Sequence, residues 1–224
     1  MRPIDRGSAP KKFREYKDAR GDLIDRLGEY CSYCEMHLDA SLAVEHVQPQ
    51  SSSPHLTLVW DNFLLGCTNC NSTKKDKQIT LNYYYWPDRD NTFRAFEYCQ
   101  GGIVRVSGSL TATEQQCAQN TLELTGLDRT PKNNPSASNR RWLNRREAWD
   151  IAERAMKNLT KNNTSEMREQ IIETAKAKGF WSVWMTVFRD DRDMLDRLIK
   201  AFPGTCQSCF NSQCQPVPRP GGAL

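Results

Sequence analysis

The chain has 224 residues, and its 31 basic and 27 acidic side chains give a formal net charge of +4. Hydrophobic residues make up 38% of it, the mean hydropathy is −0.72, and no apolar run approaches the length of a membrane span, which excludes a membrane-spanning class. The mild basic excess permits a nucleic-acid partner without requiring one. The N-terminal stretch MRPIDRGSAPKKFREY has no apolar core of signal-peptide length, so we expect a cytoplasmic protein without membrane contact.

The N-terminal half predicts one helix and several short strands. Apolar residues recur at helical spacing over 10–27, and Gly28 is a natural helix stop. The segment 41–47 has the composition of a short strand. Two further strand patterns, 92–98 and 103–107, flank a pair of glycines that favours a tight hairpin turn.

From Thr111 onward the pattern is helical. Thr111 and Glu114 have the spacing of a capping box, and Gly126 closes the helix that they begin. A linker rich in Pro, Asn and Ser is then expected at 131–139, followed by a long helix through Leu159. Two more helices are expected at 165–178 and 181–202, and an irregular tail at 206–224. We find no internal repeat.

Two Cys-x-x-Cys pairs bracket a short segment of the N-terminal half. Nine cysteines in a chain without an export signal favour zinc thiolates over disulfides. Each pair can place two sulfurs on one ion, and the pairs Cys31–Cys34 and Cys67–Cys70 together complete a closed tetrahedral site. Such a zinc ion is structural, because it leaves no position for water. His37 is an alternative ligand, and two unrelated reduced pairs are the other interpretation.

The bracket encloses polar groups suited to phosphodiester cleavage. This reaction needs a base with a near-neutral pKa, for which His46 is suited, and a hard cation such as Mg²⁺ or Mn²⁺, for which Glu45 and Asn71 offer oxygen ligands. Positive charge to hold the nucleic-acid backbone is available on a polar helix expected over 71–77, at Lys74, Lys75 and Lys77. Each of these residues alone has an ordinary structural explanation, such as a helix cap for Asn71. Their joint arrangement inside the cysteine bracket favours catalysis.

This segment resembles the HNH endonuclease family, which has the ββα-metal fold. The matching stretches are Glu45-His46-Val-x-Pro, Asn62-Phe-Leu-Leu and Cys67-x-x-Cys70-Asn71-x-x-Lys74. The resemblance implies that His46 is the general base, that Glu45 and Asn71 hold one divalent cation, and that Asn62 fixes the loop after His46. The chain has Glu at the first and Asn at the third motif position, and both occur in the family. Neighbours on a flat strand point to opposite faces, so Glu45 and His46 can share a site only where the strand ends or bends.

Features outside the motif are similar to one HNH subfamily, the PtuB nucleases of Septu anti-phage systems, also found beside retrons. They are MRPIDRG, the Leu-Gly-x-Tyr-Cys-x-Tyr-Cys-Glu stretch, Trp-Ser-Val-Trp at 181–184 and Phe-Pro-Gly-Thr at 202–205. The resemblance implies bacterial defence with a PtuA-like ABC-type ATPase as partner. We therefore expect an α+β protein. It should begin with an N-terminal helix over 1–28, followed by a zinc-bracketed nuclease domain with a hairpin over 29–110. A helical partner-docking region over 111–205 and an irregular tail over 206–224 should complete it.

Several alternatives stay open from the sequence. DNA is the expected substrate, but the same centre could act on RNA, and a non-catalytic nucleic-acid-binding zinc module is the third possibility. Most of the tryptophans Trp142, Trp149, Trp181 and Trp184 are expected in the core, where they would not serve as interface anchors. A solvated face is expected for Arg140, Arg141, Arg145 and Arg146, with phosphates or an acidic partner as the alternative. A second metal site and a disordered tail of free thiols both fit Cys206, Cys209 and Cys214, with Cys99 or Cys117 as the further metal ligand.

Overall fold

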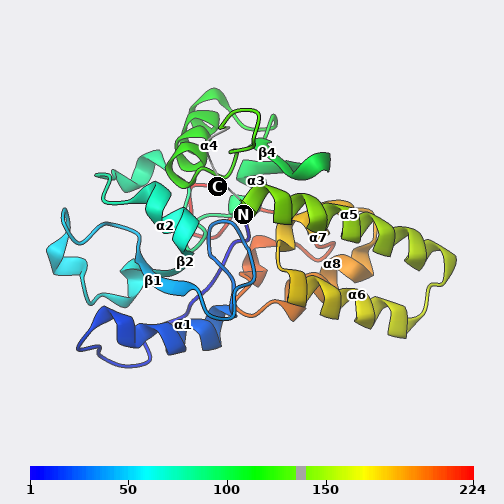
Figure 1. Cartoon of the computed structure of the whole chain (residues 1–224), viewed down its shortest axis with the longest axis horizontal. Helices are drawn as coiled ribbons and strands as arrows, with labels where there is room; N and C mark the ends of the chain where they lie inside the picture. Colours follow the sequence, from blue (N-terminus) through cyan, green and yellow to red (C-terminus); the bar gives the residue numbers. More distant parts are fainter. Residues whose placement is uncertain (135–139) are drawn as a thin grey trace.

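The structure, a computed structural model, describes residues 1–134 and 140–224 (Figure 1). Its strands are β1 (Leu42–His46), β2 (Phe63–Cys67), β3 (Phe96–Cys99) and β4 (Ile103–Val106). Its α-helices are α1 (Ala19–Leu27), α2 (Thr68–Lys74), α3 (Thr92–Ala95), α4 (Ala112–Thr125), α5 (Arg140–Lys161), α6 (Ser165–Lys178), α7 (Trp181–Val187) and α8 (Arg192–Ala201). Short 3-10 helices are η1 (Tyr16–Asp18), η2 (Pro54–Leu56), η3 (Trp60–Asn62), η4 (Leu81–Tyr83), η5 (Gln100–Gly102) and η6 (Gln207–Cys209). The fold is α+β, as predicted, with small antiparallel sheets followed by a helical region.

The strands β1 and β2 and the helix α2 form a ββα unit. β1 pairs antiparallel with β2, from His46 opposite Phe63 to Leu42 opposite Cys67. α2 begins directly after β2, and the Cys67 sulfur caps it by accepting from Cys70 N. All of β2 is buried, because α1 and α2 both contact it. The pairing puts His46 and Cys67 at opposite ends of the hairpin, roughly 14 Å apart at the rise of an antiparallel strand.

Two N-terminal helices differ from their predicted bounds. The pattern predicts a helix over 71–77, whereas α2 starts three residues earlier and ends before Lys75, whose φ of 52° is left-handed. The pattern also predicts a helix from residue 10, whereas α1 starts at Ala19. The difference arises because the aromatic ring of Phe13 turns inward and stacks on Trp60, with 5.8 Å between the ring centroids, which holds the segment before η1 in an irregular path.

The predicted hairpin is present as the pair β3 and β4, but its first strand starts at Phe96 and not at residue 92, because Thr92–Ala95 form α3. Gly101 and Gly102 form its turn with φ of 76° and 72°, values that glycine adopts without strain. Gly102 is also needed for close packing, because a Cβ atom there would lie 2.7 Å from the backbone nitrogen of Arg146 on α5. The hairpin turn and the long helix are therefore in direct backbone contact.

The C-terminal helices match the prediction at some ends and not at others. α4 has the predicted capping box between Thr111 and Glu114, and it ends at Gly126 in the left-handed conformation. The single helix predicted over 181–202 is wrong, because the chain forms α7 and α8 with a break between them. Asp191 causes the second start, since its carboxylate caps α8 by accepting from Met194 N.

The buried side chains form one continuous core that includes both the ββα unit and the helical region. Figure 1 shows α1, β1, β2 and α2 on one side and α5 to α8 on the other. Glu35, which follows the first cysteine pair, joins them: its carbonyl accepts from Phe180 N at 2.8 Å, and its carboxylate accepts from the Ser182 hydroxyl at 2.5 Å. One core therefore includes residues on both sides of the boundary expected at residue 110.

The tail after residue 205 is irregular, as predicted, but it is packed. Cys206, Cys209 and Cys214 are all buried, which contradicts the alternative of a disordered tail of free thiols. The Asn91 amide holds this segment by donating to Cys209 O at 2.8 Å and Val217 O at 2.7 Å. Across the described residues, none of the helices has both the length and the apolar character that a membrane span needs.

Candidate active site and zinc site

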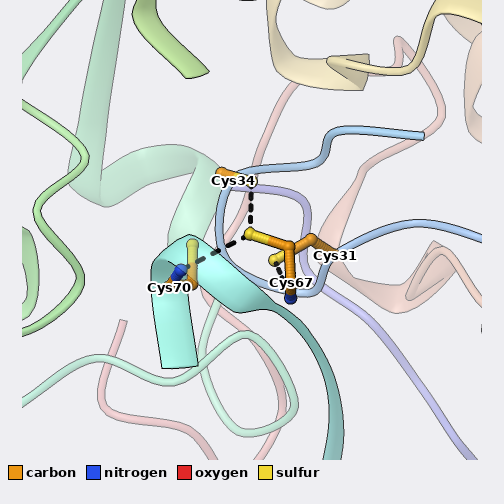
Figure 2. Close-up of side chains that lie close together, drawn as sticks. All are labelled: Cys31, Cys34, Cys67 and Cys70. Atoms are coloured by element: carbon orange, nitrogen blue, oxygen red, sulfur yellow. Dashed lines mark hydrogen bonds between the residues drawn. The ribbon is translucent and has the colours of Figure 1, made fainter. Parts of the chain in front are cut away.

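The four predicted thiols meet at one buried point. Figure 2 shows Cys31 and Cys34, from the loop before β1, facing Cys67 and Cys70, from the junction of β2 and α2. All four sulfur atoms lie within 4.8 Å of one another, and Cys34 Sγ is 3.7 Å from Cys67 Sγ. A tetrahedral zinc ion with Zn–S bonds of about 2.3 Å places its sulfurs about 3.8 Å apart. The cluster thus has the spacing of a closed structural zinc site.

Backbone groups and burial prepare this site for a metal. Cys67 N donates to Cys31 Sγ at 3.3 Å, and Cys70 N donates to Cys67 Sγ at 3.4 Å. Burial raises the pKa of the Cys31 thiol, so four thiolates in this place require a cation that replaces their protons. The alternative ligand His37 is not in the cluster, because its ring lies against Tyr30, 5.3 Å away between centroids.

A buried arginine from the helical region contacts the zinc site. Arg141 Nη1 donates to Cys70 Sγ at 3.0 Å and to Thr125 O at 2.8 Å, and the residue is 2% exposed. One turn later, Arg145 donates to Gly102 O and to Leu127 O, both at 2.8 Å, and is 1% exposed. The expected solvated face is therefore wrong for these two arginines, which bind carbonyls and a thiol inside the core.

The second metal site considered from the sequence is not present in the described residues. Among the described residues, the metal-ligating groups that lie close together in a set of three or more are Cys31 and its three partners. The tail cysteines Cys206, Cys209 and Cys214 do not form such a group, with or without Cys99 or Cys117. The reason is distance in the fold, because a closed zinc site needs four ligand atoms around one point.

His46 is held in one orientation at the end of β1. Its Nε2 lies 3.1 Å from the carbonyl oxygen of Thr57, which can only accept a hydrogen bond. The Gln50 amide nitrogen also lies 3.3 Å from Nε2, and the tautomer that donates from Nε2 to Thr57 O leaves Nδ1 as the basic nitrogen. The rings of Tyr16 and Phe63 pack edge-on against the imidazole, at 4.9 and 5.2 Å between centroids. Burial lowers the pKa of His46, with the Thr57 carbonyl opposing and Lys74 adding to the effect, so the neutral base form is favoured.

Asn62 ties the loop after His46 to the start of β2. Its side-chain oxygen accepts from Gln48 N at 2.8 Å, and its amide nitrogen donates to Gln48 O at 3.0 Å. Asn62 is 3% exposed, and its own carbonyl accepts from Val47 N at 2.9 Å. These bonds fix the two residues that follow His46, in the manner that the family resemblance implies for Asn62.

Glu45 and Lys74 form a buried ion pair next to His46. Lys74 Nζ lies 2.8 Å from Glu45 Oε1 and donates to His46 O at 2.7 Å. Lys74 is 1% exposed, so the prediction that it binds the nucleic-acid backbone is wrong. Burial raises the pKa of Glu45, and Lys74 opposes that shift. In this structure the Lys74 ammonium therefore occupies Glu45 Oε1, and a divalent cation held by Glu45 would share the carboxylate with Lys74.

The remaining predicted residues lie on or just after α2. Asn71 is half-buried and precedes Lys74 by three positions, a spacing at which helix residues are neighbours. Lys74 reaches Glu45. Cys67 caps the helix, so Asn71 is not the helix cap that was the alternative. Lys75 and Lys77 are exposed beyond the helix end and stay candidates for backbone contact.

Glu45 and His46 contact different elements, as neighbours on a strand do. Glu45 packs over Gly66 and toward α2, whereas His46 packs toward η1 and η2. β1 ends at His46, where the sequence requires the strand to end or bend if the two groups are to share a site. That Glu45 and His46 share one site stays a prediction. Sequence reasoning did not identify Thr57 and Tyr16, which both contact His46, because neither belongs to the motif residues.

Comparison with known proteins agrees with this geometry. Residues 31–77 match the family model of HNH endonucleases. The Septu protein PtuB of Bacillus thuringiensis is 31% identical over 86 aligned residues, which cover 36% of this chain and 34% of that protein. The match therefore spans about a third of the length of this relative. The segment 31–77, with its four thiols, its buried Glu45–Lys74 pair and its anchored His46, belongs to the HNH endonuclease family.

Proposed function

We propose that the chain is a divalent-metal-dependent endonuclease that hydrolyses phosphodiester bonds in DNA. The observation that carries the proposal is the anchored imidazole of His46 within the HNH segment. Nε2 lies 3.1 Å from Thr57 O, and in this proposal Nε2 donates to that carbonyl while Nδ1 takes a proton from water. The lowered pKa of His46 keeps this nitrogen unprotonated at neutral pH.

The neighbouring residues have supporting tasks in this proposal. Glu45 and Asn71 would hold one Mg²⁺ or Mn²⁺ ion, which when bound neutralises charge on the scissile phosphate. The carboxylate of Glu45, which directly precedes His46 in β1, is a hard oxygen ligand of the kind that such an ion prefers. Asn62 keeps His46 in place through its two bonds to Gln48, at 2.8 and 3.0 Å. The four thiols hold a structural zinc ion, and the exposed Lys75 and Lys77 contact the nucleic-acid backbone.

The biological setting is part of the proposal and rests on the relative. Because a protein named as the Septu protein PtuB aligns with this chain, we extend the proposal to anti-phage defence in the bacterial cytoplasm. A PtuA-like ABC-type ATPase is the proposed partner, and residues 111–205 are the proposed docking region. Co-expression and gel filtration with such an ATPase test this part separately from cleavage.

Cleavage by purified protein tests the nuclease proposal. We expect nicking or cutting of plasmid DNA with Mg²⁺ or Mn²⁺, more than hydrolysis of a structured RNA, with and without the ATPase. His46→Ala should lower the rate by at least about 100-fold, because general-base catalysis contributes typically that much or more. His55→Ala is the matched control, since His55 is exposed on η2 and has no proposed role. Equal activity of the His46→Ala and His55→Ala variants would contradict the proposal.

A further inference from the structure

The segment 10–18, which we call the basic arm, lies outside the family match and against the proposed catalytic base. It precedes α1 and has mostly exposed side chains, with Phe13 buried and Tyr16 half-buried. The HNH match begins at residue 31, so no role follows for the basic arm from that match. Its position and its charge together indicate a function.

Two aromatic side chains fix the basic arm on the active site. Phe13 stacks on Trp60 at 5.8 Å and packs edge-on to Phe63 at 6.1 Å, between ring centroids. Tyr16 packs edge-on to His46 at 4.9 Å. Phe63 also contacts His46, at 5.2 Å. The basic arm therefore packs directly against the His46 side chain, and the rings of Phe13 and Tyr16 set its position.

The cations of the basic arm point to solvent. Lys12, Arg14 and Lys17 are exposed, and in the described parts of the chain no carboxylate forms an ion pair with them. The arm's acidic residues are engaged locally, because Glu15 and Asp18 exchange side-chain and backbone bonds in a capping box. Three unpaired positive charges thus remain on a rigidly anchored segment.

The dimensions of the basic arm suit a nucleic-acid backbone. Six residues, from Lys12 to Lys17, span at most roughly 20 Å when extended. Double-stranded DNA carries one charge per about 1.7 Å of its axis, so several phosphates would face the arm. Lys17 is next in the chain to Tyr16, which touches His46. A phosphodiester placed for attack near His46 therefore has neighbouring phosphates within reach of the arm.

We propose that Lys12, Arg14 and Lys17 bind the phosphates that flank the scissile bond of the substrate strand. The inference rests on the proposed nuclease function and adds a substrate-positioning surface outside the HNH segment. The shared ligand chemistry is a phosphodiester backbone, and DNA is its proposed source. Aromatic anchoring distinguishes this surface from an ordinary solvated charge run, because the anchors tie the cations to the catalytic base.

Binding measurements on three full-length variants test this inference. Fluorescence anisotropy with a labelled 20-base-pair DNA duplex, and with an RNA duplex of the same sequence, is measured in a His46→Ala background to prevent cleavage. The test variant carries Lys12→Gln, Arg14→Gln and Lys17→Gln. The matched control carries Arg154→Gln, Lys157→Gln and Lys161→Gln, three exposed cations toward the far end of α5 (Figure 1). Thermal unfolding checks that both variants fold.

We expect the test variant to bind DNA about tenfold or more weakly at 0.1 M salt, and its salt-dependence slope to fall by about two to three relative to the control. A larger loss on RNA than on DNA would overturn the assignment to DNA. Equal affinity and equal slope in the test and control variants would overturn the inference. The proposed nuclease function would still stand in that case if the wild type cleaves DNA. A wild type that neither binds nor cleaves nucleic acid would overturn both.

Discussion

Lys74 connects the helix α2 to the two central residues of the HNH segment. Its ammonium group donates to His46 O at 2.7 Å and lies 2.8 Å from Glu45 Oε1, and both side chains of the ion pair are almost fully buried. A buried charge that loses its partner is strongly destabilising, whereas replacing both partners by neutral groups often is not. Lys74 therefore has a structural role in this state of the protein and holds β1 against α2.

Replacing Lys74 should be costly unless Glu45 changes as well. We expect Lys74→Met to lower the free energy of unfolding by about 3–5 kcal/mol, because the Glu45 carboxylate is left buried without its counter-charge. The double variant Lys74→Met with Glu45→Gln should recover most of this loss. Denaturant unfolding measures all three, and Lys75→Met is the control, since Lys75 is exposed. A full loss in the double variant would show that packing, and not charge, stabilises this contact.

At the scale of single residues, the sequence predicts the role of a residue when its partners lie close to it in the motif sequence. The cysteine pairs follow from local spacing, and the structure brings them together as expected. The loop-fixing role of Asn62 follows from the family resemblance, and the structure shows its bonds to Gln48. Lys74 was mistaken for a surface lysine because its burial depends on helix phase. Cys70 faces the metal site, and a residue four positions later lies on the same buried face. That spacing is the signal that would have identified Lys74 as buried.

At the scale of elements, the zinc site joins a loop to a strand–helix junction. Cys31 and Cys34 come from the loop before β1, and Cys67 and Cys70 from the end of β2 and the first turn of α2. The metal thus closes the chain around β1 and β2 at the end of the hairpin opposite to His46. Metal removal should loosen these elements first and affect His46 through them.

Serine at one thiol position should remove the metal and unfold this unit. We expect Cys34→Ser to lose the single bound zinc per chain, because structural zinc contributes several kcal/mol to folding and four ligands complete the site. Hydrogen exchange over residues 29–78 should become fast, and elemental analysis should find little zinc. Cys99→Ser is the control, because Cys99 lies outside the cluster. Slow exchange in a metal-free Cys34→Ser protein would contradict a structural role for zinc.

The elements themselves were predicted where the signal is local. The β3–β4 hairpin and α4 follow from a glycine pair and a capping box, each contained within a few residues. The division between α7 and α8 was missed although Asp191 is a good N-cap, because the apolar spacing continues on both sides of it. The irregular path of the basic arm was missed because Phe13 packs on Trp60, 47 positions later in the sequence.

At the scale of the whole molecule, the ββα unit and the helices share one core, and buried polar contacts cross between them. Glu35 accepts from Ser182, which is 147 positions away, and Arg141 reaches both Cys70 and the end of α4. Single-sequence patterns predict the α+β class and the order of elements, but no local pattern records such distant pairs. A chain that ends near residue 110 would lose these contacts, so the ββα unit is not expected to keep its zinc alone.

The contact between α5 and the zinc site can be tested with neighbouring arginines. We expect Arg141→Ala to lower the free energy of unfolding by about 3 kcal/mol, because buried carbonyls and a thiolate lose a charged donor. Zinc release to a chelator should also be faster than in the wild type, as followed by a colorimetric indicator. Arg140→Ala is the matched control, since Arg140 is exposed at the same helix start. Equal release rates in the two variants would mean that Arg141 does not support the metal site.

The hydrogen bond from Arg141 to Cys70 has a consequence for regulation. When two events share one contact, the effect of the first on the second equals the effect of the second on the first. A partner that pulls α5 away from the thiols would weaken zinc affinity by the same factor by which zinc loss weakens the seating of α5. Because of this reciprocity, zinc retention would report whether α5 of the helical region is packed against the ββα unit that carries His46.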